Sequence, residues 1–256
     1  MIDTHAHLSK RFCESVEVDG VRVILAASNL EDSKENIELA QADKKQFWAS
    51  VGIHPQCTDP QNRESIKDQL LLLEELVKAN KVIVAIGECG LDFSTPPPNE
   101  KERSRNEQEA LFRGQIEIAQ EYKLPLIIHA RKAVDEVVLI LKDYKDIGGV
   151  FHCYAGGKKR IKNVLGLGES WYFGFDGNIT YEVGLNEVVS EIPRDRLLAE
   201  TDCPCLTPVP HRGEINKPEY VKFVYNKVAE IWQTNLEEAE KIIDNNARRL
   251  FKIKSL

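Results

Sequence analysis

Short apolar runs rich in β-branched residues alternate along this chain with longer stretches in which apolar residues recur every three or four positions. The run over residues 82–87 is apolar on both faces, which is typical of a parallel strand covered on both sides. Helical spacing is shown by Ile66, Leu70, Leu73 and Val77. The repeated alternation of strand and helix predicts an α/β protein.

Eight apolar runs are predicted to be strands, and eight parallel strands fit a closed barrel better than an open sheet. These runs cover residues 2–8, 21–27, 47–53, 82–87, 126–129, 149–152, 171–175 and 196–200. Helices are predicted over residues 66–77, 112–119, 134–141, 161–165, 221–231 and 236–251. Thr234 and Glu237 form a predicted capping box for the last helix. Because nothing marks an internal linker, the prediction is a (β/α)8 TIM barrel in a single domain, residues 1–256.

Composition and charge narrow the class of protein further. The chain has 256 residues, of which 42% are hydrophobic and 29% charged, and this excludes a disordered or fibrous protein. A net charge of −7 argues against a broad nucleic-acid or membrane surface, although a local basic patch stays possible. No apolar run is long enough to cross a membrane. Without a signal segment or a CxxC pair, the six cysteines favour reduced thiols in a cytoplasmic protein.

The residues that end the predicted strands carry most of the candidate chemistry. In a parallel barrel all these ends lie on one face, where active sites are built. Five of the six histidines fall at or near such ends, together with two carboxylates. These residues are His5, His7, His54, His129, His152, Glu88 and Asp202.

The spacing of His5 and His7 suits the chelation of one cation, because residues i and i+2 of a strand point to the same side. Taken alone, each histidine has an ordinary structural explanation, and each carboxylate can serve as a helix cap or in a buried ion pair. Together, four histidines, Glu88 and Asp202 suffice for two divalent ions that share a bridging carboxylate. Imidazole ligands favour Zn, Mn, Fe or Ni over Mg, and the sequence does not choose among these metals.

The ordered set of motifs resembles the TatD family of metal-dependent deoxyribonucleases, within the amidohydrolase-like TIM-barrel superfamily. The matching segments are Ile2-Asp3-Thr4-His5-Ala6-His7-Leu8, Gly52-Ile53-His54-Pro55, Gly87-Glu88-Cys89-Gly90-Leu91-Asp92, Ile128-His129-Ala130-Arg131, Phe151-His152-Cys153-Tyr154, Glu200-Thr201-Asp202-Cys203-Pro204 and Arg212-Gly213-Glu214-Ile215-Asn216. The resemblance extends over nearly the whole chain. Cys203 and Cys205 depart from the family pattern, which leaves their role and the substrate preference open.

The resemblance also implies a role for each site residue. His5, His7 and Asp202 would hold one metal ion, His129 and His152 the other, and Glu88 would bridge the two. Asp202 and Glu88 would be the catalytic carboxylates, and His54, Arg131 and Arg212 are expected to contact substrate. Asp92 and Glu200 are expected to orient the metal-binding imidazoles. Asp176 ends the seventh run, where a turn is the more ordinary explanation.

Two metal ions of this kind can activate a hydroxide for in-line attack on phosphorus, with Asp202 as proton acceptor. The leading hypothesis is therefore a deoxyribonuclease acting on DNA ends or single strands, helped by basic loops at Arg131, residues 158–162 and Arg212. The alternative is a hydrolase of a carboxylic ester, lactone, amide or aminoacyl-tRNA, because the same hydroxide attacks a carbonyl. A third class is a binding protein that has lost catalysis, which the complete ligand set disfavours.

Overall fold

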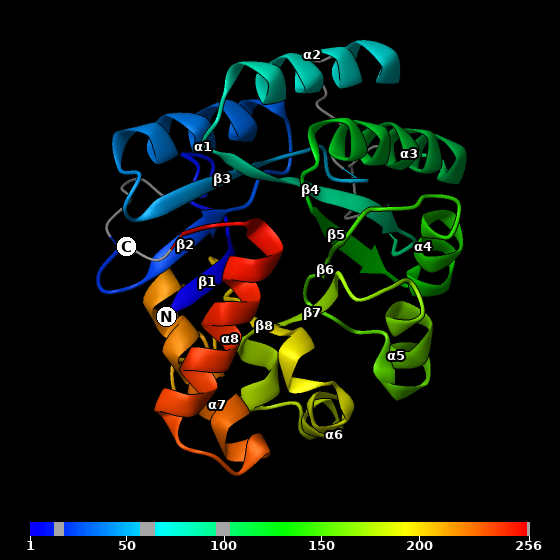
Figure 1. The fold of residues 1–256 in the computed structure, drawn as a ribbon. Coiled ribbons are helices and arrows are strands. Elements are labelled where there is room, and N and C mark those ends of the chain that lie inside the picture. The colour runs from blue at the N-terminus through cyan, green and yellow to red at the C-terminus, as the bar shows by residue number, and fades with distance from the viewer. Residues whose placement is uncertain (13–17, 57–64, 96–102, 255–256) are drawn as a thin grey trace.

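The computed structural model describes residues 1–12, 18–56, 65–95 and 103–254. Eight strands form one sheet in chain order, each parallel to its neighbour (Figure 1). They are β1 Ile2–Ala6, β2 Arg22–Leu25, β3 Phe47–Val51, β4 Ile83–Asp92, β5 Leu126–Arg131, β6 Gly149–Phe151, β7 Trp171–Phe175 and β8 Leu197–Ala199. Together with the helices between them they confirm the predicted (β/α)8 barrel.

The barrel closes where the first strand meets the segment that follows the last. Ala6 forms a parallel bridge with Cys203, and the His7 amide donates to the Cys203 oxygen at 2.9 Å. The Asp202 amide donates to the His5 oxygen, also at 2.9 Å. Closure therefore joins the two segments that carry His5, His7 and Asp202.

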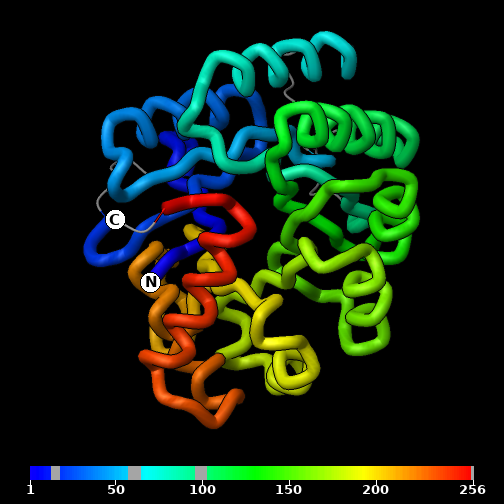
Figure 2. Tube along the Cα trace, viewed as in Figure 1, coloured from blue at the N-terminus to red at the C-terminus, as the bar shows by residue number. Residues whose placement is uncertain are grey.

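Eight α-helices of the described residues accompany the strands, and seven of them lie around the barrel (Figure 1). They are α1 Leu30–Ala42, α2 Ile66–Ala79, α3 Arg105–Tyr122, α4 Val134–Leu141, α5 Gly157–Leu165, α6 Val183–Glu191, α7 Val221–Trp232 and α8 Leu236–Phe251. Short 3-10 helices are η1 Gly177–Thr180, η2 Arg194–Arg196 and η3 Pro218–Tyr220. In Figure 2 the last helix, drawn in red, crosses in front of the barrel. Its residues Leu250 and Phe251 pack on Ile2, Ile24 and Ile127, so α8 covers the N-terminal end of the strands.

The structure corrects several details of the predicted elements. β4 continues to Asp92 rather than ending at residue 87, because it keeps pairing with β5 beyond the bulge between Ile86 and Cys89. Helix α8 is capped by Asn235, which accepts from the Glu238 amide, so the predicted capping box lies one residue too early. Helices α1 and α6 were not predicted. The buried face of α1 carries Asp32, Ser33 and Asn36 beside Ile37 and Ala40, which hides its apolar periodicity.

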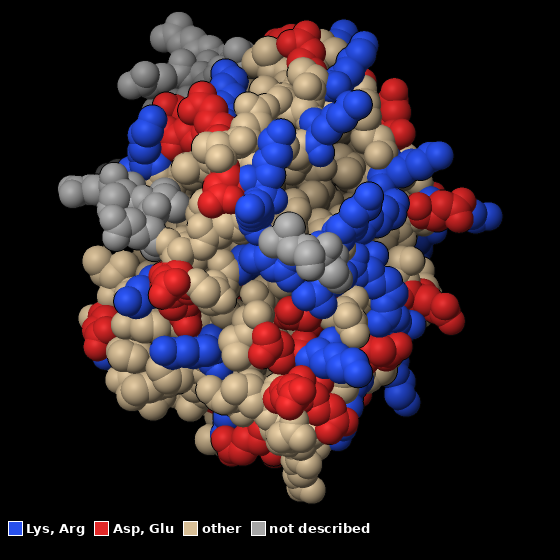
Figure 3. Space-filling view, turned by 60° about the vertical axis from the view of Figure 1, so that its left-hand side comes forward, with Lys and Arg blue, Asp and Glu red and all other residues tan. Residues whose placement is uncertain are grey.

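Basic side chains gather on one side of the molecule. Figure 3 shows many Lys and Arg side chains in the middle and to the right of the view. Four lysines lie just before β3 and β4 and just after α8, at the N-terminal end of the strands. A groove there is lined by Lys44, Lys81, Lys252 and Lys254 beside Trp48. This concentration lies at the opposite end of the barrel from His5 and His7. Among the described helices, none combines the length and hydropathy that a membrane crossing requires.

A buried polar contact fixes the start of the chain to α7 and α8. The Tyr225 hydroxyl lies 2.8 Å from Asp244 Oδ1 and 2.9 Å from the Ile2 oxygen, and the Ile2 amide donates to Asp244 Oδ1 at 3.0 Å. All three residues are buried. Since buried polar groups are costly when left without partners, this contact stabilises the position of β1 against both helices.

Replacing Tyr225 by Phe is expected to lower the free energy of unfolding by about 1–3 kcal/mol, because the Ile2 oxygen loses its buried partner. Urea denaturation followed by circular dichroism measures the loss. Tyr122→Phe is the matched control: its hydroxyl donates to Glu74 at 3.3 Å on a partly exposed site, and a change below about 0.5 kcal/mol is expected. Equal losses in both variants would contradict a special role for the Tyr225 contact.

Candidate metal centre

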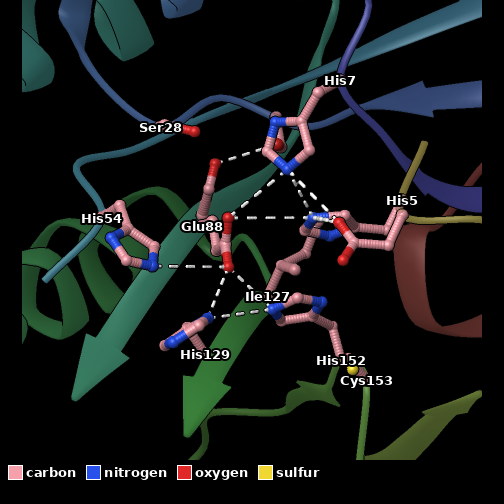
Figure 4. Close-up of polar contacts among 12 residues, drawn as sticks. His5, His7, Ser28, His54, Glu88, Ile127, His129, His152 and Cys153 are labelled. Atoms are coloured by element: carbon pink, nitrogen blue, oxygen red, sulfur yellow. Dashed lines mark hydrogen bonds and ion pairs between the residues drawn. The ribbon is translucent and has the colours of Figure 1, made fainter. Parts of the chain in front are cut away.

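Glu88 lies at the C-terminal end of the barrel with five histidines around it (Figure 4). It comes from β4 and is 4% exposed. The β4 backbone approaches β5 so closely that a side chain at Gly90 would overlap the backbone oxygen of His129. Gly90 also has φ +135°, which side-chain-bearing residues rarely adopt. The sequence Gly-Glu-Cys-Gly therefore brings the Glu88 carboxylate and β5 together.

The two carboxylate oxygens of Glu88 face different histidine pairs. Oε1 lies 2.7 Å from His129 Nδ1 and 2.7 Å from His152 Nε2. Oε2 lies 3.8 Å from His5 Nε2 and 3.6 Å from His7 Nε2. One carboxylate thus stands between two sets of nitrogen atoms, as a bridging ligand would.

The nitrogen atoms within each pair have the spacing of metal ligands. His5 Nε2 and His7 Nε2 are 3.2 Å apart, and His129 Nδ1 and His152 Nε2 are 3.3 Å apart. Ligand atoms at about 2.0–2.1 Å from a tetrahedral zinc ion lie roughly 3.3 Å from one another. Asp202 Oδ1 completes the first set, at 3.6 and 3.5 Å from the first pair. The donor types and their spacing therefore fit divalent transition metals.

The charges of these groups are strongly coupled. Burial would raise the pKa of Glu88, but the charge of His152 and hydrogen bonds to His129 and His152 outweigh it and hold that pKa well below its usual range. Burial and the neighbouring His152 lower the pKa of His5, whereas the Glu88 and Glu200 carboxylates raise that of His152 in spite of burial. The His5 and His152 rings stack with centroids 4.1 Å apart. The stacked pair is therefore expected to carry one positive charge at most, on His152, and metal binding would displace the extra proton.

Two carboxylates lie behind the histidines. Asp92 Oδ2 is 3.1 Å from His129 Nε2, the ring nitrogen that points away from Glu88. Glu200 is fully buried, accepts from the Cys153 amide, and lies 3.7 Å from His152 Nδ1. Both positions suit residues that orient a ligating imidazole.

Asp3 is a further supporting residue that the sequence analysis did not single out. Its buried carboxylate accepts from the amides of His5 at 3.2 Å and Thr201 at 2.9 Å, and from the Thr201 hydroxyl at 2.6 Å. Burial raises its pKa to about 8. Asp3 thus ties β1 to the segment that positions Asp202. In the sequence, Asp3 could be noticed only as an acid in a buried strand, two residues before His5. Its partner Thr201 lies 198 positions away.

His54 joins the same cluster from the loop after β3. Its Nε2 lies 3.8 Å from Glu88 Oε1, and its ring packs edge-on against His129 at 4.3 Å. Burial lowers the pKa of His54 to about 3, so the ring is neutral. Because Nδ1 accepts from the Gln56 amide at 3.1 Å, the proton is assigned to Nε2. This tautomer makes His54 a hydrogen-bond donor toward the site, although its position would also allow metal binding.

The basic residues that were predicted to contact substrate differ from one another in their surroundings. Arg131 is exposed at the end of β5. Arg212 lies flat over Tyr181 at 4.0 Å and donates to the Tyr181 hydroxyl and the Thr207 oxygen. Lys158 forms ion pairs with acids of α6, at 2.8 and 3.1 Å, and Arg160 with one of α4. Lys158 and Arg160 therefore join helices, as expected of a solvated helix start.

An eight-stranded parallel barrel that gathers imidazoles and carboxylates at the C-terminal ends of its strands defines the class of metal-dependent barrel hydrolases. The family model described as TatD related DNase matches residues 2–252. The chain therefore belongs to the TatD family, which confirms the resemblance of its motifs.

Several relatives match nearly the whole chain. The uncharacterized metal-dependent hydrolase YabD of Bacillus subtilis is 36% identical across 99% of both chains. The 3'-5' ssDNA/RNA exonuclease TatD of Edwardsiella piscicida is 32% identical over 90% of this chain and 88% of its own. The crystal structure of the TatD homologue YjjV from Escherichia coli K12 has a TM-score of 0.84 and 27% identity, covering 99% of this chain and 98% of its own. Together they make this chain a metal-dependent hydrolase of the TatD family.

Replacing Asp92 by Asn is expected to weaken metal binding by about 10–100-fold, because the His129 imidazole loses the carboxylate that orients it. Equilibrium dialysis with metal analysis measures the affinity. Asp135→Asn, on the exposed side of α4 where Asp135 pairs with Arg160, is the control and should bind metal like the unchanged protein. Unaltered affinity in Asp92→Asn would show that this carboxylate does not support the centre.

Proposed function

We propose that this chain is a metal-dependent deoxyribonuclease that hydrolyses phosphodiester bonds at DNA ends or in single strands. The observation that carries the proposal is the placement of Glu88, with one carboxylate oxygen toward each histidine pair. Two adjacent ligand sets that share a carboxylate suit the in-line displacement of a phosphodiester.

In this proposal the ligands divide into two sets. His5, His7 and Asp202 would hold one divalent ion, His129 and His152 would hold the other, and Glu88 would contribute to both sets. Bound ions at such a centre lower the pKa of a water molecule and neutralise charge on the phosphoryl oxygens. Zn, Mn, Fe and Ni suit the imidazole-rich set better than Mg.

The remaining steps are assigned to side chains of this chain. Asp202 is the most exposed ligand, with 18% of its side chain accessible, so its carboxylate can accept the proton that the attacking water loses. His54 Nε2 donates a hydrogen bond to a phosphoryl oxygen, and Arg131 supplies a positive charge at the rim. Glu200 and Asp92 hold the His152 and His129 rings in place.

Two further observations support the proposed activity and a cytoplasmic location. Relatives of similar length are named 3'-5' ssDNA/RNA exonucleases. Among the described cysteines, Cys89, Cys153 and Cys205 have free thiols, which favours a reducing compartment such as the cytoplasm. Cys203 is 1% exposed and packs in the core, which supports a structural role for it.

Replacing Glu88 by Gln is expected to abolish metal-stimulated release of nucleotides from single-stranded DNA, by more than about 100-fold, because the amide cannot bridge two cations. The measurement compares release with added Mn²⁺, Zn²⁺ or Mg²⁺ and with a chelator, on protein of known metal content. Glu109→Gln on the exposed face of α3 is the control.

A substrate panel separates this proposal from the alternative. The panel contains single-stranded DNA, a neutral carboxylic ester, a lactone and an aminoacyl-tRNA. Turnover of one of the carbonyl substrates, without nucleotide release, would replace the nuclease proposal by the ester or amide hydrolase. Nuclease activity that persists in metal-analysed Glu88→Gln would contradict the mechanism.

A further inference from the structure

A pocket of about 150 Å³ lies between the loops that follow β6 and β7. It is lined by Cys153, Tyr154 and Ala155 after β6, and by Phe175, Asp176, Asn178, Ile179, Glu182 and Leu185 from the end of β7 into α6. Cys153 directly follows His152, so one wall of the pocket begins at the residue next to the metal centre. None of the roles proposed for the histidines involves this pocket.

The apolar part of the pocket is held firmly. The Tyr154 ring packs edge-on against Phe173 at 4.9 Å and Phe175 at 6.3 Å, and its hydroxyl donates to the Gly157 oxygen at 3.0 Å. Gly156 has no room for a side chain, since a Cβ there would lie 2.7 Å from the Tyr154 ring. The wall is therefore preformed rather than shaped by a ligand.

The polar part presents an acid and an amide. Asp176 is 3% exposed, accepts from the Asn178 amide at 2.8 Å, and lines the pocket beside Cys153. The Asn178 side-chain oxygen accepts from the Tyr181 hydroxyl, which lies beneath Arg212. Within the described residues no partner is recorded for the Asn178 Nδ2 group. The pocket thus offers a hydrogen-bond acceptor and a donor beside apolar walls.

The volume limits what can enter. A cavity of ~150 Å³ lined by apolar side chains holds a benzene-sized ring. A single six-membered ring with polar edges therefore matches the size and the chemistry of the lining better than a two-ring purine does.

We propose that this pocket binds the pyrimidine base of a nucleotide that flanks the cleaved phosphate. The inference rests on the proposed nuclease function and adds to it the part of the substrate that sits beside the metal centre. Apolar contact with Tyr154 and Phe175 would hold the ring, and Asp176 and Asn178 would contact its polar edge.

The test compares three single-stranded oligonucleotides that differ only in the nucleotide flanking the cleaved bond, which is a pyrimidine, a purine or an abasic residue. The flanking position is varied on each side of that bond. Wild-type protein is expected to cleave the pyrimidine substrate with kcat/KM about tenfold above the abasic one, at one of the two positions. The purine substrate should resemble the abasic one.

The variant is Ala155→Phe, which fills the pocket from an exposed position and so leaves the core intact. Its ratio of pyrimidine to abasic cleavage is expected to fall close to one, with metal content and melting temperature unchanged. Leu139→Phe, at a site on α4 that is 66% exposed, is the matched control and should keep the wild-type ratio.

The outcomes are distinguishable. A wild-type protein that cleaves pyrimidine, purine and abasic substrates equally at both positions overturns the base pocket alone. An Ala155→Phe protein that keeps the wild-type ratio does the same. A wild-type protein that releases no nucleotide from any of them, in the presence of metal, overturns the nuclease function together with the pocket.

Discussion

The arrangement of this molecule depends on one buried carboxylate held between two pairs of imidazole rings. A carboxylate as deeply buried as Glu88 is costly unless charged or hydrogen-bonding partners surround it. The nearest of those partners come from β5, from the residues that directly follow β1 and β6, and from the loop after β3, so these segments must reach one point at the same end of the barrel. Gly90 lets β4 approach β5 closely enough. Asp3 ties β1 to the segment that carries Asp202. The contacts that close the barrel therefore also bring the residues of the site together.

Much of the fold and of the candidate site could be predicted from the sequence, because the C-terminal ends of all strands of a parallel barrel lie on one face. Apolar runs give the strands, and a histidine or acid at the end of each run necessarily points to the common end. The failures have physical causes. Helix α1 buries Asp32, Ser33 and Asn36, so its hydrophobic periodicity is weak. The role of Asp3 depends on Thr201, a partner remote in sequence, which no local pattern reveals. The length of β4 depends on pairing with β5 after a bulge.

The negative charge of an anionic substrate would be neutralised mainly by the metal centre, rather than by the basic side chains described around it. Lys158 and Arg160 of α5 are paired with acids of neighbouring helices, and Arg212 is held on Tyr181. The lysines beside Trp48 lie at the opposite end of the barrel. Under the proposed function, a phosphodiester at the site would meet bound cations and, among the described residues, His54 and Arg131. This arrangement suits a short stretch of single strand or a chain end better than a long duplex, and it agrees with the acidic net charge.

The metal centre and the neighbouring pocket share a structural element. The Cys153 amide donates to Glu200, the carboxylate behind His152, while Cys153 also lines the pocket beside Asp176. A ring that enters the pocket would press on a residue whose backbone supports a metal ligand. Residues from strand ends, fixed by the barrel, provide the chemistry, whereas the loops after β6 and β7 contact the variable part of the substrate. Selectivity at this site can therefore change through those loops, provided that the Cys153 backbone keeps its contact with Glu200.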